Sequence, residues 1–271
     1  MGLTYLLKGK EYMTDKKFLY GFVLLIVIIS CETVFAWEYI GHTEAVQSVQ
    51  ICPEISARVT KIHFHEGDFV NKSAALFTLD NAELQAEVSL KKAELAMASA
   101  KFDGVAKYYA RLKATKKAIS ASDLDNAESE ERQAKAGIDA AKASLKLAEI
   151  QLGHTKITAP FAGQIGKTNF HVGSYVSPEN VLCEIVQTNP IRILFAMPDR
   201  DYLRVKNAWE NLKYELILAD GSLYSGTIEK DFEDNVMNSD TGTINIWLKV
   251  SNENNILLPG ALVRVKVTQG E

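Results

Sequence analysis

Two stretches of this 271-residue chain are similar to each other at a constant spacing of 106 positions. Residues 66 to 80 read EGDFVNKSAALFTLD, and residues 172 to 186 read VGSYVSPENVLCEIV. The pairs that match at this spacing are Gly67 with Gly173, Val70 with Val176, Leu76 with Leu182, Lys61 with Lys167, Phe64 with Phe170 and His65 with His171. Such a repeat constrains the fold strongly, because both copies must form the same local structure.

The residues around each copy of the repeat predict short β-strands. Residues 51–81 and 154–188 contain alternating apolar and polar runs that are interrupted by turn-forming residues. Gly67 and Gly173 are expected to form equivalent structural turns in the two halves. Neither half can bury two faces alone, so we expect the halves to close together into one flattened, pseudo-symmetric β-sandwich.

A long helical segment separates the two halves. Residues 82–153 contain no proline and are rich in Ala, Lys, Glu and Leu, which are strong helix formers. Ser120, followed three residues later by Asp123, is a start signal for a second helix. Each helix carries a heptad seam, which predicts an antiparallel coiled-coil hairpin. The seam positions are Leu84, Val88, Lys91, Leu95, Ala98, Phe102, Val105, Tyr109 and Leu112, and then Leu124, Ala127, Glu131, Ala134, Ile138, Ala141, Leu145, Ala148 and Leu152.

A further stripe of small and apolar residues lies beside each seam. It consists of Leu90, Ala93, Met97, Ala100 and Gly104 on the first helix and Ala136, Ala140, Ala143, Leu147 and Ile150 on the second. One seam is enough to hold a hairpin together, so this lateral stripe suggests packing against a neighbouring copy of the chain. The alternative is that alanine is simply favourable in any helix.

The C-terminal part predicts a second β-structure. Residues 189–268 contain alternating runs that are separated by turn residues, with one short helix near Pro198 to Trp209. This pattern predicts a small antiparallel β-barrel. Residues 37–50 are expected to supply the first strand of that barrel.

The half-motif EGDFVNKSAALFTLD resembles the halves of biotinyl and lipoyl carrier domains. Those carriers present a modified lysine on the turn between the halves, whereas TLDNAEL holds no lysine here and the helical segment replaces the turn. The order of the parts, with a second half that begins TKITAPFAGQIGK, is similar to the periplasmic adaptor subunits, or membrane fusion proteins, of tripartite efflux pumps. The expected fold class is therefore mixed α and β, multidomain and elongated. It comprises a split lipoyl-like β-sandwich, an inserted antiparallel α-helical coiled-coil hairpin and a small antiparallel β-barrel.

The stretches NPIRILFAMPDRDYLRVK and LLPGALVRVKVTQGE are most similar to adaptors of resistance-nodulation-division transporters. This resemblance implies a trimeric or hexameric homo-oligomer that links an inner-membrane transporter to an outer-membrane channel protein, for efflux of drugs or small toxic compounds. Two alternatives stay open: an adaptor of an ABC-type exporter or type I secretion system, and a truncated, non-functional adaptor. Family members usually continue with a membrane-proximal domain, which we expect to be absent because the sequence stops at Glu271.

The resemblance also points to the tip of the hairpin. Adaptors of this family carry an Arg, a Leu four residues later and a Ser seven residues after that, and they dock onto the channel with this motif. Here Leu112 and Ser120 stand in comparable places, but they are eight residues apart and Tyr108 occupies the arginine position. Channel docking through Tyr108, Leu112 and Ser120 is therefore a hypothesis. The alternative for Leu112 is ordinary seam packing.

Residues 1–36 predict an export signal. A short basic segment precedes an apolar run from Phe18 to Ile29, which is too short for a comfortable membrane span. The stretch Ile28 to Cys31 resembles a lipobox, which would make Cys31 the lipidation site, whereas Val34 to Ala36 suits ordinary signal peptidase. An uncleaved signal anchor is the third reading. Each reading places the chain in the periplasm of a Gram-negative bacterium, and a lipid or signal anchor would hold it at the inner membrane.

The sequence contains no pattern that is typical of a catalytic or cofactor-binding site. The motifs GxGxxG, GxSxG, HExxH and paired CxxC and the P-loop are absent, so we expect neither an enzyme nor a cofactor. The net charge of -4 gives no reason to expect nucleic acid. His63 and His65 share one face of an expected strand, where a metal site is the lesser alternative to ordinary exposed histidines. Cys52 and Cys183 are expected as free thiols, with a periplasmic disulfide as the lesser alternative.

Overall fold

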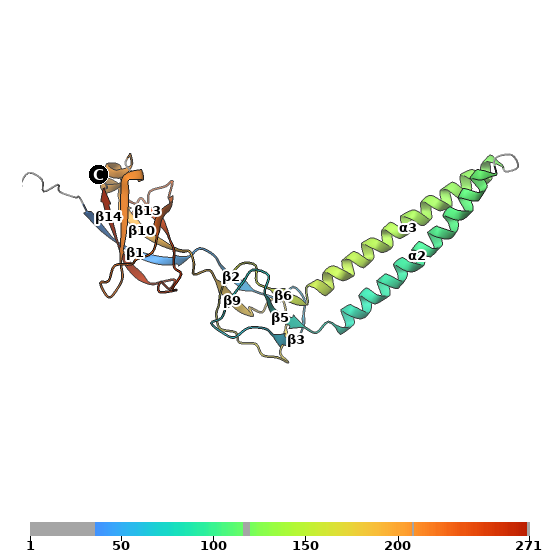
Figure 1. Ribbon diagram of the computed structural model, residues 1–271, viewed down its shortest axis with the longest axis horizontal. Helices are drawn as coiled ribbons and strands as arrows, with labels where there is room; N and C mark the ends of the chain where they lie inside the picture. The colour runs from blue at the N-terminus through green and yellow to red at the C-terminus, as the bar shows by residue number, and fades with distance from the viewer. Residues whose placement is uncertain (1–35, 116–119, 208, 270–271) are drawn as a thin grey trace, which may run out of the picture.

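The computed structural model describes residues 36–115, 120–207 and 209–269. These residues form three units in an elongated, bent molecule: a β-barrel at one end, a flattened β-sandwich in the middle and a helical hairpin at the other end (Figure 1). Cys31 and the remainder of the expected export signal lie outside the described residues. Within the described part of the chain, no helix is long and apolar enough to cross a membrane.

The sandwich consists of two four-stranded sheets that are built from both halves of the repeat. The first half supplies β2 (Ser48–Ile51), β3 (Ala57–Ile62), β4 (Phe69–Val70) and β5 (Ala75–Leu79), and the second half supplies β6 (Lys156–Thr158), β7 (Gly163–Ile165), β8 (Tyr175–Val176) and β9 (Cys183–Val186). The strand orders are β2-β9-β7-β4 and β6-β5-β3-β8. Each strand of the first half has an equivalent strand in the second half. Replacing every strand by its equivalent converts one sheet order into the other, so the sandwich has an internal pseudo-two-fold symmetry.

The two halves exchange their shortest strands. Phe69 of β4 pairs with Gln164 of β7, and the equivalent pair one repeat away is Tyr175 of β8 with Arg58 of β3. Each two-residue strand therefore completes the sheet that the other half begins. The halves cannot separate without breaking both pairings, which makes the sandwich one folding unit although its halves are far apart in the sequence.

The turn before each exchanged strand has the same geometry. Gly67 has a φ of 88° and Gly173 a φ of 95°, in the region that L side chains rarely adopt. The Gly67 N–H donates to the Ile165 carbonyl at 2.9 Å, and the Gly173 N–H donates to the Val59 carbonyl at 2.8 Å. These equivalent bonds tie each glycine turn to the opposite half.

The sandwich core is closed by side chains from both halves. Leu76 and Phe77 of the first half and Leu182 and Ile185 of the second are fully buried in one cluster. Cys183 is also buried in this cluster, whereas Cys52 is exposed, and both are free thiols. The disulfide alternative is therefore wrong. Burial raises the pKa of the Cys183 thiol to about 11, because an apolar environment disfavours the thiolate.

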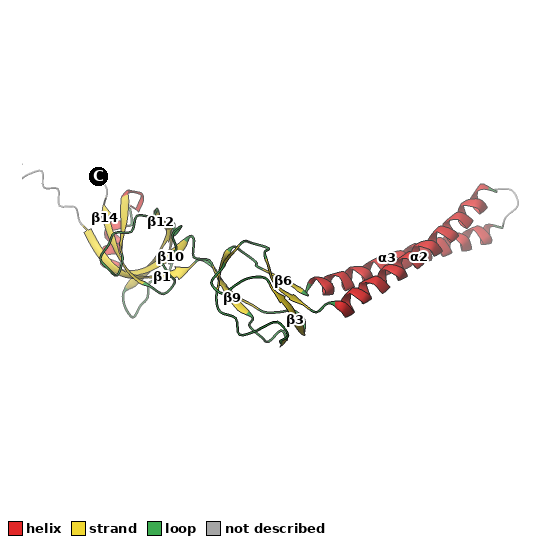
Figure 2. Ribbon diagram, turned by 60° about the horizontal axis from the view of Figure 1, so that its bottom comes forward, coloured by secondary structure: helices red, strands yellow, loops and turns green. Residues whose placement is uncertain are grey.

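The hairpin consists of α2 (Ala82–Ala114) and α3 (Ala121–Gly153), which are each 33 residues long and extend away from the sandwich (Figure 2). At about 1.5 Å per residue, each helix spans roughly 50 Å. Every position of both heptad seams is buried or half-buried, whereas every position of the lateral stripe is exposed. The predicted coiled-coil hairpin is confirmed.

The barrel is a six-stranded antiparallel sheet with the order β11-β14-β1-β10-β13-β12. Its strands are β1 (Ala36–Ala45), β10 (Ile191–Pro198), β11 (Leu212–Ile217), β12 (Ile228–Glu233), β13 (Thr243–Val250) and β14 (Leu262–Gln269). Two short helices, α4 (Asp199–Val205) and η1 (Trp209–Asn211), follow β10. Alternate side chains of the strands point inward and form one buried cluster, which includes Phe195, Ile246 and Val265.

The segment expected as one barrel strand over residues 37–50 is two strands. β1 ends at Ala45, and β2 begins at Ser48 and pairs with β9 in the sandwich. The chain therefore passes from barrel to sandwich at residues 46–47. Residues 42–52 contain no proline or glycine, so no sequence signal marked a break at this crossing.

A buried polar residue fixes the joint between barrel and sandwich. Asn252 is fully buried, and its amide N–H groups donate to the carbonyls of Thr188 and Leu257 at 2.9 and 2.8 Å. Its side-chain oxygen accepts from the Leu257 N–H at 3.1 Å. Thr188 lies in the segment that leaves β9 for the barrel, and at this crossing Gln187 N–H donates to the Gln47 carbonyl at 2.8 Å. The two segments that connect barrel and sandwich, at residues 46–47 and 187–190, are thus hydrogen-bonded to each other, and the second is also bonded to Asn252 of the barrel.

Candidate functional site

The tip of the hairpin carries the three residues that the sequence singled out. Tyr108 is 47% exposed and Leu112 is half-buried in the last turns of α2. Ser120 is the exposed N-cap of α3, and its hydroxyl accepts from the Ser122 N–H at 3.2 Å. The residues between the helices, 116–119, lie outside the described part of the chain. The fold brings all three residues to the same end of the hairpin, and Ser120 has a structural role there as a helix cap.

Opposite charges gather on the two helices near this tip. The exposed residues of α2 near the tip include Lys107, Arg111 and Lys113, and α3 begins with exposed Asp123 and Asp125. Basic residues near a helix C-terminus and acidic residues near an N-terminus both interact favourably with the helix dipole. The tip therefore presents a basic side and an acidic side to any partner.

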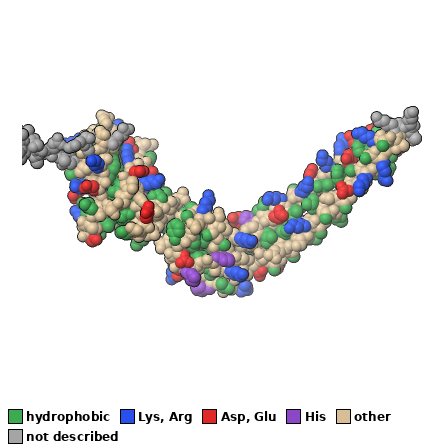
Figure 3. All heavy atoms as spheres, viewed as in Figure 1, with side chains coloured by type: hydrophobic (Ala, Val, Ile, Leu, Met, Phe, Trp, Pro, Cys, Tyr) green, Lys and Arg blue, Asp and Glu red, His purple; other side chains and the backbone are tan. Residues whose placement is uncertain are grey.

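The flanks of the hairpin expose large apolar side chains. Leu90 and Met97 of α2 are 57% and 71% exposed, and Leu147 and Ile150 of α3 are 60% and 46% exposed. Figure 3 shows apolar side chains along the length of the hairpin between charged ones. These four residues all belong to the lateral stripe, which the seam between the two helices leaves uncovered.

The histidines of the sandwich have separate partners. The Nε2 atom of His63 lies 2.8 Å from the Thr78 hydroxyl, and His65 Nδ1 lies 3.5 Å from the Asp68 carboxylate with a side chain that is 96% exposed. Across the described ranges, no three His, Cys, Asp or Glu residues are grouped so that they could hold a metal ion. The arrangement of His63 and His65 therefore gives no support to the metal alternative.

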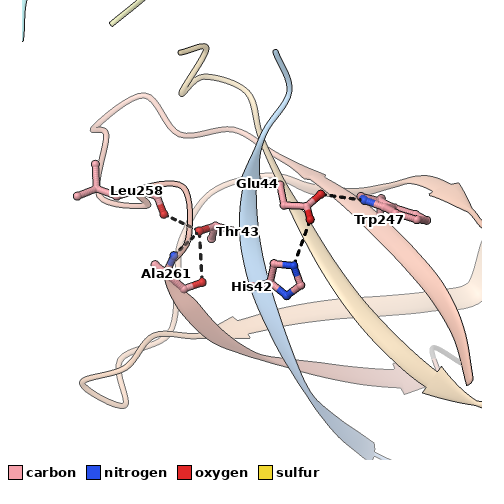
Figure 4. Close-up of polar contacts among 6 residues, drawn as sticks. All are labelled: His42, Thr43, Glu44, Trp247, Leu258 and Ala261. Atoms are coloured by element: carbon pink, nitrogen blue, oxygen red, sulfur yellow. Dashed lines mark hydrogen bonds and ion pairs between the residues drawn. The ribbon is translucent and has the colours of Figure 1, made fainter. Parts of the chain in front are cut away.

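The barrel wall carries a polar network that the sequence did not indicate. Thr43 is buried, donates its hydroxyl to the Leu258 carbonyl and accepts from the Ala261 N–H at 2.9 Å (Figure 4). It thereby fixes the loop before β14. On the outer side of β1, Glu44 accepts from the indole N–H of Trp247 at 3.2 Å, and its other oxygen lies 3.1 Å from His42 Nε2. The residues of this outer network come from strands far apart in the sequence.

Two family models together match the chain from the sandwich to its C-terminus. Residues 47–188 match the barrel-sandwich hybrid domain of RND MFP, the membrane fusion proteins of the resistance-nodulation-division class. Residues 190–271 match the β-barrel domain of the same proteins. The boundary between the two matches coincides with the joint that Asn252 holds.

Curated relatives are identical to this chain at about a third of the aligned positions. "Multidrug efflux pump subunit AcrA" of Escherichia coli is 32% identical over 247 residues, which cover 85% of this chain and 61% of the relative. "Efflux pump periplasmic linker BepF" of Brucella suis is 34% identical over 236 residues, which cover 84% of this chain and 57% of the relative. The chain thus spans about three fifths of the length of these relatives.

Solved structures share the fold at lower sequence identity. A putative efflux transporter from Bacteroides eggerthii has a TM-score of 0.66 at 19% sequence identity, and the match covers 88% of this chain and 70% of the transporter chain. A MacA-MexA chimeric protein with the α-hairpin domain of Pseudomonas aeruginosa MexA has a TM-score of 0.64 at 21% sequence identity, and the match covers 89% of this chain and 84% of the chimeric chain. Since the barrel-sandwich hybrid match alone takes in more than half of the residues, the chain belongs to the family of resistance-nodulation-division membrane fusion proteins.

Proposed function

We propose that this chain is a non-enzymatic periplasmic adaptor, which links an inner-membrane resistance-nodulation-division transporter to an outer-membrane channel for efflux of drugs or small toxic compounds. The observation that carries the proposal is the end-to-end order of the family's parts, with the hairpin tip and the barrel at opposite ends of the molecule (Figure 1). Such a molecule has separate ends for two partners. Relatives named as multidrug efflux pump subunits support the choice of cargo class.

In this proposal the protein works by assembly, and proton-driven transport takes place in the partner. The hairpin tip meets the channel, the barrel meets the transporter, and the Asn252 joint connects the barrel to the sandwich that lies between these two ends. Affinity purification of the tagged full-length chain from crosslinked native membranes, followed by mass spectrometry, tests this. Recovery of both an inner-membrane transporter and an outer-membrane channel supports the adaptor, and recovery of neither contradicts it.

The location of the adaptor follows from the same proposal. The chain lies in the periplasm of a Gram-negative bacterium and is held at the inner membrane by a lipid on Cys31 or by an uncleaved signal anchor. A relative from Brucella suis is named a periplasmic linker. Replacement of Cys31 by Ser should release the protein from washed membranes if the lipid is the anchor, and retention of the variant would favour the signal anchor.

Channel docking is proposed for the tip residues Tyr108, Leu112 and Ser120. Leu112→Asp should abolish recovery of the channel and leave the unfolding transition of the sandwich unchanged. Because Leu112 is also a seam residue, the matched control is Leu95→Asp, which places the same charge in the same seam but far from the tip. Loss of the channel with Leu112→Asp alone supports docking at the tip, whereas equal loss in both variants would show that only hairpin folding matters.

Packing between copies is proposed for the lateral stripe. Its exposed apolar residues on both helices would allow α2 of one copy to lie against α3 of the next in a trimeric or hexameric adaptor. Met97→Asp and Leu147→Asp, which change the two flanks separately, should each lower the oligomeric mass measured in detergent-extracted assemblies. An unchanged mass in both variants would count against this packing.

A further inference from the structure

A cleft lies at the base of the hairpin, where α2 leaves the sandwich beside β3 (Figure 1). Its volume is about 710 Å³, which falls within the range of pockets that hold drug-sized molecules. The first two turns of α2 form one wall, and the paired strands β3 and β8 contribute to the other. Neither the tip residues nor the lateral stripe lines this cleft, so the contacts proposed above leave it unused.

One part of the cleft lining is apolar. These residues come from the sandwich and from α2, and they are Ile55, Ala57, Leu84 and Tyr175. Tyr175 is 66% exposed, which leaves its ring accessible to a ligand. The face of an aromatic ring is apolar and also attracts cations. The lining can therefore hold an apolar group and favours a positive charge close to it.

The helix wall of the cleft carries negative charge that has no partner. Glu83 and Glu87 lie one turn apart on α2, and both are exposed and line the cleft. Neither side chain forms an ion pair or a hydrogen bond with a described residue. The helix dipole favours Glu83, which lies in the first turn, but Glu87 lies beyond that turn. Like charges four residues apart destabilise a helix, and a cation beside them would relieve this repulsion.

The other charged residues of the lining do not neutralise these glutamates. Asp80 adds a third carboxylate and Arg58 is the one cation among the lining residues, which leaves a net charge of −2. Arg58 donates to the Gly173 carbonyl at 2.8 Å, and Asp80 accepts from the Ala82 N–H at 3.2 Å. Both therefore have partners within the chain. The charge that is available to a ligand is negative.

A cation with an apolar body fits this lining better than a metal ion does. Throughout the described ranges, no three His, Cys, Asp or Glu residues are grouped so that they could hold a metal. A metal ion would also leave the apolar part of the cleft without a contact. An amphipathic organic cation can place its charge beside the glutamates and its apolar part against Tyr175.

The pseudo-symmetry of the sandwich supplies an internal comparison for the cleft. Phe69 is the equivalent of Tyr175 in the other half, and Gln164 is the equivalent of Arg58. Phe69 is 57% exposed, which is close to the value for Tyr175, but it does not line the cleft. The two aromatic residues thus have similar exposure and equivalent places in the fold. They differ in whether the carboxylates of α2 lie beside them.

We propose that the cleft at the hairpin base binds an amphipathic organic cation, with its charge near Glu83 and Glu87 and its apolar part against Tyr175. This inference goes beyond the proposed function, because it gives the adaptor a ligand site of its own. A ligand in the cleft contacts α2 and the sandwich at once. It therefore restrains the hairpin relative to the sandwich.

The test measures binding of ethidium, a fluorescent aromatic cation, to the purified full-length chain in a neutral detergent. The wild-type protein should bind ethidium saturably after the signal of detergent alone is subtracted. Glu83→Gln combined with Glu87→Gln should weaken binding by about tenfold, because both unpaired charges are lost. Tyr175→Ala should weaken it by about fivefold, because the aromatic face is lost.

Matched control variants separate the cleft from general effects of charge and surface. Glu130→Gln combined with Asp139→Asn removes two exposed carboxylates from α3, farther along the hairpin from the cleft. Phe69→Ala removes the equivalent aromatic ring of the other half. Both controls should bind ethidium within about twofold of the wild-type protein. All variants should retain the wild-type Tm within a few degrees, so that a change in binding is not a change in folding.

Three outcomes would overturn the inference. The first is no saturable binding of ethidium, and the second is equal binding of the aromatic anion anilinonaphthalene sulfonate. The third is a loss of ethidium binding in the controls that equals the loss in the cleft variants. A lower oligomeric mass of the Glu83 and Glu87 variant, without ethidium binding by the wild-type protein, would assign the cleft to a basic side chain of a second copy. Each outcome concerns the isolated chain, so the proposed adaptor function stands or fails separately.

Discussion

The barrel and the hairpin achieve stability in different ways. The barrel encloses a cluster of large side chains, among which Phe195, Ile246 and Leu248 are essentially inaccessible to solvent. The buried residues of the hairpin helices are Val88 and three alanines, and the remaining seam positions are half-buried. A barrel surrounds its core on all sides, whereas two helices can cover each other along only one seam. The comparison teaches that the barrel is self-sufficient, while the hairpin leaves most of its surface available to partners.

The strongest test of this comparison is truncation of a phenylalanine in each region. Phe195→Ala should lower the free energy of unfolding by about 4 kcal/mol, because it opens a cavity in a closed core. Phe102→Ala in the seam should cost only about 1.5 kcal/mol, because that ring is half-buried. Chemical unfolding followed by fluorescence for the barrel and by circular dichroism for the helices measures both. Equal losses would contradict the difference between the two regions.

An intermediate effect is expected at the joint that connects barrel and sandwich. Asn252→Ala should cost about 2 kcal/mol, because it leaves the carbonyls of Thr188 and Leu257 and one N–H group buried without partners. Asn254→Ala, at an exposed position of the same loop, should change the stability by less than about 0.5 kcal/mol. Thermal unfolding of both variants provides the measurement, and a neutral Asn252→Ala would show that the joint is not a stabilising element.

The smallest effect is expected at the hairpin tip. Ser120→Ala removes the N-cap of α3 and should weaken its first turn by about 1 kcal/mol. Hydrogen exchange should then speed up in that turn only, because fraying at the tip does not reach the barrel. Ser144→Ala, in the middle of α3, serves as the control, since its hydroxyl only bonds back to the Ala140 carbonyl and its loss should be neutral. Faster exchange throughout α3 in the Ser120 variant would indicate a more cooperative hairpin than its sparse seam suggests.

The hairpin and the pseudo-symmetric sandwich could be predicted from the sequence because their signals are periodic. The seam residues recur at heptad spacing, and Gly67 and Gly173 recur with their neighbours at one constant offset. Both signals depend only on which residues alternate or repeat. They can therefore be recognised in the sequence without knowledge of the tertiary contacts.

The outer network of His42, Glu44 and Trp247 and the Asn252 joint could not be predicted in this way. His42, Leu194 and Trp247 become neighbours only through the strand order of the barrel, and no local sequence pattern predicts that order. Asn252 stands in a turn-like stretch, SNENN, where asparagine ordinarily faces solvent. Its burial depends on a segment more than sixty residues away. The tip residues are an intermediate case, since the sequence placed them at the hairpin end but left their docking role as a proposal.

The seam of the hairpin also makes the molecule a spacer of adjustable length. α2 starts at the sandwich and α3 ends there, so inserting one heptad into each helix keeps the seam in phase and leaves the sandwich untouched. Such an insertion would move the tip about 10.5 Å farther from the sandwich along the hairpin axis. The reach of a protein with this architecture can therefore change in whole heptads, while the surfaces at its two ends stay the same.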